Sequence, residues 1–163
     1  MINIMASQTK VCKELLLDDV VEIAVMRDKE IAWTQPKCVR FIATNITMPP
    51  PVFVMTTKTD ENLYMSETPT LDIETEVKVY GKSYAYKLNV TSLYNIGDMD
   101  EKASELDGQD VAFMLTRYDG TRQVVNPLSG TSSIKYSSSD GTDRKASLEI
   151  SCQSCSPLIA VED

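Results

Sequence analysis

Hydrophobic and polar residues alternate along several short stretches of the chain, and this period of two predicts β-strands. In the clearest stretch, from Leu71 to Val79, every second residue is apolar or threonine, and the residues between them are charged. The alternation returns over 84–90, after a break at Gly81. One charged face and one apolar face are typical of a half-buried strand in an antiparallel sheet. The two stretches therefore predict a β-hairpin.

The N-terminal half predicts shorter strands. Residues 19–26 alternate loosely and are rich in β-branched residues, which predicts a strand, and extended patterns resume at 31–34 and 38–43 after a charged turn. The prolines at 49–51 cannot lie in a central strand, because proline has no backbone N–H to donate to the ladder. We interpret this run as a corner of the fold.

Two segments do not fit the strand pattern. Residues 10–17 are too few to assign and fit one helical turn or an extended arm, so 1–18 is a candidate N-terminal arm. The polar stretch 56–70 is long for a loop in a compact domain, and loops of this length are usually functional or mobile. Within it, Tyr64 and Met65 are apolar without regularly spaced partners. They are candidate anchors for a neighbouring subunit, and the alternative, given equal weight, is that they pack on their own core.

One short helix is predicted over residues 98–107. Asp98 is a candidate N-cap, acidic residues occupy the first turn, and Gly108 follows the end. A helix of this length is not stable alone, so we expect its apolar stripe to rest on the sheet. The stripe consists of Met99, Ala103 and Leu106.

Two Asp-Gly pairs, Asp119-Gly120 and Asp140-Gly141, each lie between strand patterns and predict hairpins with two-residue type I′ turns. The second hairpin has a serine-rich tip and few large apolar residues, so we expect it to project or to form a sheet edge. Its strands are expected at 134–136 and 146–150. Together these patterns predict one mainly β domain over 1–163: an antiparallel β-sandwich or partly open barrel with one short flanking helix.

Composition narrows the function classes. The chain has 163 residues, a formal net charge of −8 and no histidine. An acidic chain lacks the positive field that nucleic-acid phosphates need, so no specific nucleic-acid binding is expected. The absence of histidine excludes Ser-His-Asp, Cys-His and HExxH chemistry. We find no glycine-rich phosphate motif, and we expect neither an enzyme nor a cofactor or metal site.

Two further expectations concern location. No run approaches the roughly 20 apolar residues that span a bilayer, and the first residues lack the pattern of a secretion signal. We therefore expect no membrane partner and a chain made in a cytosol. The acidic residues at 72, 74 and 76 alternate along a strand, and we interpret them as a solvated face rather than a metal site.

The four cysteines include one Cys-x-x-Cys motif, Cys152 and Cys155. This spacing occurs in metal knuckles and redox pairs, but Cys12 and Cys38 do not form a second motif, and a proline follows at 157. We interpret the motif as two strand-end thiols in a reducing compartment. A zinc or redox role is the alternative.

The order of elements over about 71–161 resembles that of tail-tube and tail-connector proteins of bacteriophages. The parts that carry the resemblance are the helix at 98–108, the hairpin at 111–125 and the long loop at 56–70. The resemblance implies a non-enzymatic virion protein, assembled in the host cytoplasm, that forms a homo-oligomeric ring and contacts neighbouring virion rings or connector proteins. The C-terminal hairpins are then the sheet borders that sister molecules join. Candidate interface residues are Tyr64, Met65, Pro50, Tyr136, Asp140 and Gly141.

The alternative function is a β-sandwich binding module that recognises protein or carbohydrate through its loops. Tyr64, Tyr94 and Tyr118 are the candidate contacts for that role.

Overall fold

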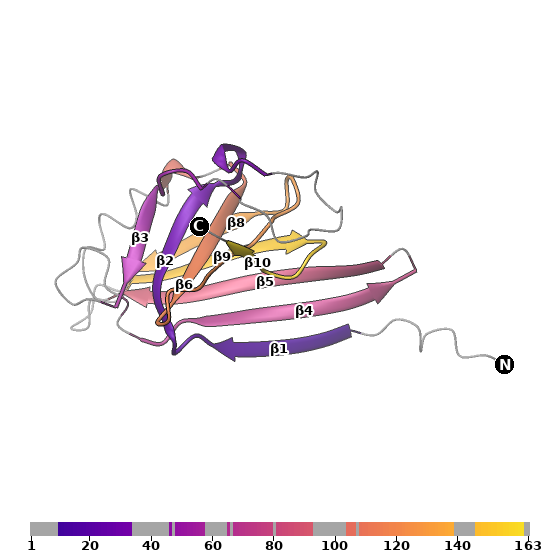
Figure 1. The fold of residues 1–163 in the computed structure, drawn as a ribbon, viewed down its shortest axis with the longest axis horizontal. Helices are drawn as coiled ribbons and strands as arrows, with labels where there is room; N and C mark the ends of the chain where they lie inside the picture. Colours follow the sequence, from indigo (N-terminus) through magenta and orange to yellow (C-terminus); the bar gives the residue numbers. More distant parts are fainter. Residues whose placement is uncertain are drawn as a thin grey trace.

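The fold is a sandwich of two antiparallel five-stranded sheets, so the predicted mainly β sandwich is confirmed (Figure 1). A short 3-10 helix, η2 (Asp28–Glu30), follows the second strand. The computed structural model describes residues 10–33, 46, 48–57, 65, 67–79, 81–92, 104–106, 108–138 and 146–161.

The two sheets are called sheet A and sheet B, and the strands of sheet B run across those of sheet A (Figure 1). Sheet A has, in spatial order, β1 (Lys10–Leu16), β4 (Thr70–Lys78), β5 (Gly81–Ser92), β9 (Ala146–Ser154) and β8 (Ser133–Ser138). Sheet B has, in spatial order, β10 (Ile159–Val161), β7 (Arg122–Val124), β6 (Val111–Arg117), β2 (Val20–Arg27) and β3 (Phe53–Thr56).

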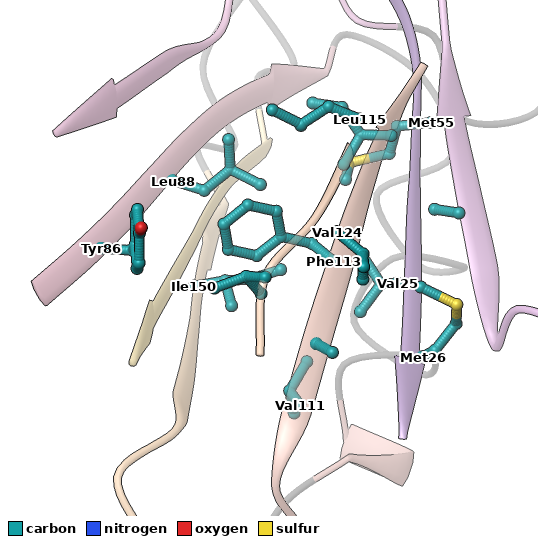
Figure 2. Packing of buried hydrophobic residues seen from close by; sticks show 14 of the residues in the cluster. Val25, Met26, Met55, Tyr86, Leu88, Val111, Phe113, Leu115, Val124 and Ile150 are labelled. Atoms are coloured by element: carbon teal, nitrogen blue, oxygen red, sulfur yellow. The ribbon is translucent and has the colours of Figure 1, made fainter. Parts of the chain in front are cut away.

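The core lies between the facing sides of the two sheets. Phe113 of β6 is fully buried and points toward sheet A, where Leu88 of β5 and Ile150 of β9 lie beside it (Figure 2). Leu88 and Ile150 are opposite each other in the ladder, so both side chains leave sheet A on the same face. The apolar rows of both sheets therefore form one cluster that holds the sandwich together.

The predicted hairpin of β4 and β5 is confirmed, with Lys78 opposite Gly81. Its apolar row is buried only at one end: Leu71 is 0% exposed, Val77 is 38% exposed and Val79 is fully exposed. The hairpin end of β4 and β5 reaches beyond β2 and β6 (Figure 1). Alternation along the sequence thus marks the strand correctly, but the second sheet covers only part of it.

The hairpin of β6 and β7 forms where it is predicted, but its turn differs from the expected one. Gly120 N–H donates to the Arg117 carbonyl, and Arg117 N–H donates to the Thr121 carbonyl, both at 2.9 Å. The loop therefore has three residues, with Gly120 at φ +90° in the left-handed region. The prediction of a two-residue type I′ turn is wrong here. Asp119 accepts bonds from the Thr121 hydroxyl and N–H at 2.7 and 3.0 Å, which lowers the pKa of its carboxyl.

Other predictions have mixed outcomes. Residues 10–16 form strand β1 at the edge of sheet A, so the extended interpretation of this segment is confirmed and the helical one is wrong. Most of the predicted helix at 98–107 lies outside the described residues; Ser104 and Glu105 are helical, and Leu106 is fully buried. The predicted strand at 38–43 also lies outside the described residues.

Candidate assembly surfaces

Sheet A has longer edge strands than sheet B. Sheet B ends in β3 and β10, which have 4 and 3 residues. Sheet A ends in β1 and β8, which have 7 and 6 residues. Very short edge strands are one way in which proteins prevent unwanted strand pairing. Sheet B follows this rule and sheet A does not, so the edges of sheet A are its candidate contact surfaces.

The two C-terminal hairpins differ in whether their strands remain open. β6 pairs with both β2 and β7, and β7 pairs with both β6 and β10. The expectation that this first hairpin supplies an open border is therefore wrong, because its own chain caps both sides. In the second hairpin, β9 lies between β5 and β8, whereas β8 pairs only with β9 among the described strands. The expectation of a sheet edge is confirmed for β8.

The β8 strand presents alternating faces to the two sides of sheet A. Ile134 and Tyr136 lie opposite Ile150 and Leu148 of β9, and both are half-buried against the core. Between them, the Lys135 side chain is exposed on the outer face. A hydroxyl–hydroxyl bond of 2.7 Å joins Ser133 to Ser151. The core thus fixes one face of β8, while none of the other described strands pairs with the second side of its backbone.

The other predicted interface residues lie in different places. Met65 is in the core at 4% exposure, and its N–H donates to the Thr56 carbonyl at 2.8 Å. This position is the one given by the alternative interpretation, in which the residue packs on its own core, so Met65 does not line an outer contact surface. Pro50 is exposed. Tyr64, Asp140 and Gly141 lie outside the described residues.

Strand β1 is an exposed surface that the sequence alone does not assign. Six of its seven residues are exposed, and it pairs with β4 along one side. Lys10 Nζ lies 2.7 Å from Glu74 Oε1 on β4, and this hydrogen bond with the carboxylate raises the pKa of Lys10. A signal was present in the sequence, because Lys10, Cys12 and Glu14 alternate with Val11, Lys13 and Leu15. The lysine at 13 interrupts the apolar row and hides the pattern.

The outer face of sheet A is polar and slightly hollowed. A depression of about 660 Å³ crosses β1, β4, β5 and β9, and its lining includes the short side chains of Ala85, Ser151 and Cys12 and the longer ones of Glu74 and Gln153. Lys87 and Glu149 form an ion pair of 3.8 Å on this face. Within the described part of the chain, no group of three or more cysteine and acidic side chains is placed to hold a metal ion. The face offers polar contacts.

The cysteines correct one expectation. Cys155 is disulfide-bonded, and its partner lies outside the described residues. The interpretation of Cys155 as a thiol is therefore wrong. Cys152, three residues earlier, carries a thiol that is buried on the inner face of β9 opposite Tyr86. Because Cys155 is bonded elsewhere, Cys152 and Cys155 are not paired with each other as a redox motif.

Of the three tyrosines proposed for a binding module, only Tyr118 is among the described residues. Tyr118 is 85% exposed at the tip of the β6–β7 loop, whereas Tyr64 and Tyr94 lie outside the described residues.

Comparisons with known proteins give no relative. No protein-family model, no curated protein and no solved structure matches the chain. Among the described residues, no helix is both long enough and apolar enough to cross a membrane.

Proposed function

We propose that this chain is a non-enzymatic structural protein that assembles with copies of itself into a ring, in a bacteriophage tail or head–tail connector. The observation that carries the proposal is the β8 strand, a six-residue edge that pairs with β9 alone among the described strands. Unpaired N–H and C=O groups along such an edge are a template for another chain. In this proposal, β8 contacts a different surface of the next copy.

A ring requires that kind of contact. When two different surface patches meet, each copy keeps one patch for the next neighbour, and the chain of contacts closes if the rotation allows it. Backbone hydrogen bonds at the β8 edge supply such a contact without requiring a large apolar patch. The proposal also includes a contact with a neighbouring virion ring or connector protein, because the element order resembles that of tail-tube and tail-connector proteins.

The charge of the chain fits a tube that DNA passes through. Each copy carries a net charge of −8, and the charges of all copies in a ring add. An acidic inner surface repels DNA phosphates, so the genome slides along it rather than binding.

Native mass spectrometry of the purified chain tests the ring and the role of β8. Successive N–H groups of a strand point to opposite sides, so the N–H groups of residues 137 and 138 point to different sides of β8. Proline removes the N–H, and therefore one of the two variants Ser137→Pro and Ser138→Pro removes a donor from the open edge only. This variant is recognised by an unfolding midpoint close to that of the wild type. We expect it to shift ring subunits to monomer at least tenfold, while alanine at the same position, which keeps the N–H, leaves rings intact. A monomeric wild-type chain at all concentrations, or rings that survive the proline, contradicts the proposal.

The second candidate is the binding module, which the exposure of Tyr118 favours. Tyrosine at a loop tip has an apolar ring and a polar hydroxyl, which suits recognition of protein or carbohydrate. A glycan and protein array probed with the wild-type chain and with Tyr118→Ser tests it. Binding that is lost in the variant, from a chain that stays monomeric, supports the module over the ring.

A further inference from the structure

We propose that β1 of one copy pairs antiparallel with β1 of a second copy, with the two Cys12 residues opposite each other. This contact goes beyond the proposed ring. Subunits of a ring follow one another by rotation about the ring axis, whereas a strand that pairs with itself is two-fold symmetric. The partner is therefore a second copy of this chain in a separate, face-to-face arrangement, which would join two rings or two single subunits.

The edge of β1 is accessible. Among the described strands it pairs only with β4, and the exposed fractions of Val11 and Leu16 are 53% and 65%. Apolar side chains that are so exposed on an edge strand lose water contact when a second strand is added beside them. The backbone groups on the open side gain hydrogen-bond partners in the same step.

Sheet geometry limits which residues can lie opposite each other. Cys12 lies opposite Glu74 of β4, and Lys10 and Glu14 lie opposite Glu76 and Asp72. Directly opposite residues share a face, so Lys10, Cys12 and Glu14 all belong to the polar outer face. A two-fold pair keeps outer faces together only when outer-face residues meet outer-face residues, because a slip by one residue exchanges the faces.

Among the registers that remain, the one centred on Cys12 brings opposite charges together. In that register Lys10 lies opposite Glu14 of the partner subunit, and by symmetry Glu14 lies opposite the partner subunit's Lys10. Each contact adds to the existing ion pair of Lys10 with Glu74, so the ammonium group lies between two carboxylates. Opposite charges at directly opposed positions stabilise a strand pair.

The neighbouring registers are less favourable. A shift of the centre to Lys13 places two lysines opposite each other, and a shift to Val11 leaves Lys10 opposite Cys12 of the partner subunit. Both lose the two ion pairs. The charges of β1 therefore act in two ways: they oppose pairing in the register centred on Lys13 and favour the register centred on Cys12.

The contact is small, and this decides how it must be measured. One edge strand on each side buries less than the roughly 1,200 Å² of a stable interface, so we expect a weak dimer. The symmetric position of Cys12 makes covalent trapping suitable. Diamide oxidises two thiols to a disulfide, takes up the two electrons and two protons, and is itself reduced to the hydrazine.

The trapping experiment uses the full chain and moves one cysteine by one position. The wild type is expected to form a Cys12–Cys12 dimer with diamide, mapped by mass spectrometry of non-reduced peptides, and Cys12→Ser is expected to form none. In the double variant Cys12→Ser/Lys13→Cys, position 13 lies opposite Val11 of the partner subunit. The two introduced thiols are then on diagonally neighbouring residues, beyond the roughly 7 Å Cα separation that a disulfide allows. We expect at least tenfold slower linking.

A charge exchange tests the register independently of the thiol position. Glu14→Lys places lysines opposite each other and is expected to slow Cys12 linking at least fivefold at low salt. Lys10→Glu with Glu14→Lys restores opposite charges and is expected to return the rate to within about twofold of the wild type. The proposal is overturned if linking is as fast in the shifted-cysteine variant as in the wild type, or if its rate does not change with these charges. Either result would mean that linking reports random collision of exposed thiols.

Native mass spectra of Cys12→Ser separate this proposal from the ring. If rings form but the wild-type chain gives no Cys12–Cys12 link, the β1 contact alone is refuted. Register-specific linking in a chain that forms no rings refutes the ring alone.

Discussion

At the scale of the residue, burial rather than hydrophobicity decides what an apolar side chain contributes. Phe113 and Val79 are both apolar, yet Phe113 is fully buried between the sheets and Val79 is fully exposed at the β4–β5 turn. Phe113 contacts side chains from both sheets (Figure 2). Removing it leaves a cavity in a close-packed interior, whereas shortening Val79 leaves the core unchanged.

We therefore predict that Phe113→Ala lowers the free energy of unfolding by about 3–5 kcal/mol. Val79→Ala is the matched control and should change it by less than about 0.5 kcal/mol. Urea denaturation followed by tryptophan fluorescence measures both values. Equal effects of the two substitutions would contradict the assignment of Phe113 to the centre of the core.

At the scale of the element, alternation and turn residues locate the strands but not the conformation of each turn. The β6–β7 hairpin lies where the Asp-Gly signal places it, and Gly120 has the expected positive φ. The signal does not show whether the loop has two or three residues, because glycine satisfies a left-handed position in both. The hydrogen bonds of Arg117 decide between them.

Gly120 offers a direct test of this turn. At φ +90° an L side chain is strained, and no atom lies within 4 Å of an added Cβ. Backbone strain is thus the sole expected cost of Gly120→Ala, and we predict a loss of roughly 1–2 kcal/mol. Gly120→Asn should lose less, since asparagine tolerates the left-handed region better. Urea unfolding of both variants checks this order, and an alanine variant as stable as the wild type would contradict the turn.

Edge strands mark the limit of what local pattern can predict. The pairing partners of a strand come from distant parts of the chain: β1 pairs with β4 some sixty positions away, and β7 is enclosed by β10 near the end. No feature within 121–125 shows that a later segment caps it. The sequence therefore predicts the sandwich and the β8 edge. It does not predict that the first C-terminal hairpin is enclosed, or that β1 pairs with β4 alone among the described strands.

At the scale of the whole molecule, Cys155, which follows β9, is disulfide-bonded to a partner outside the described residues. The sequence could not reveal this, because the spacing of Cys152 and Cys155 suggests a local pair. In the structure, strand alternation buries Cys152 on the inner face of β9, while Cys155 follows the strand end.

We predict that Cys155→Ser lowers the free energy of unfolding by roughly 2–4 kcal/mol, the usual effect of losing a native disulfide. Cys12→Ser, at an exposed thiol, should leave it within about 0.5 kcal/mol. Thiol titration of the denatured, unreduced chain checks the assignment, because Cys12 and Cys152 should react. Four reactive thiols would contradict it.

Electron cryomicroscopy of the purified chain tests assembly through the β8 edge most directly. We expect closed rings in which the density of β8 (Ser133–Ser138) continues, at strand spacing, into density of the adjacent subunit. Single subunits, or rings in which β8 faces solvent all along its open side, would contradict it.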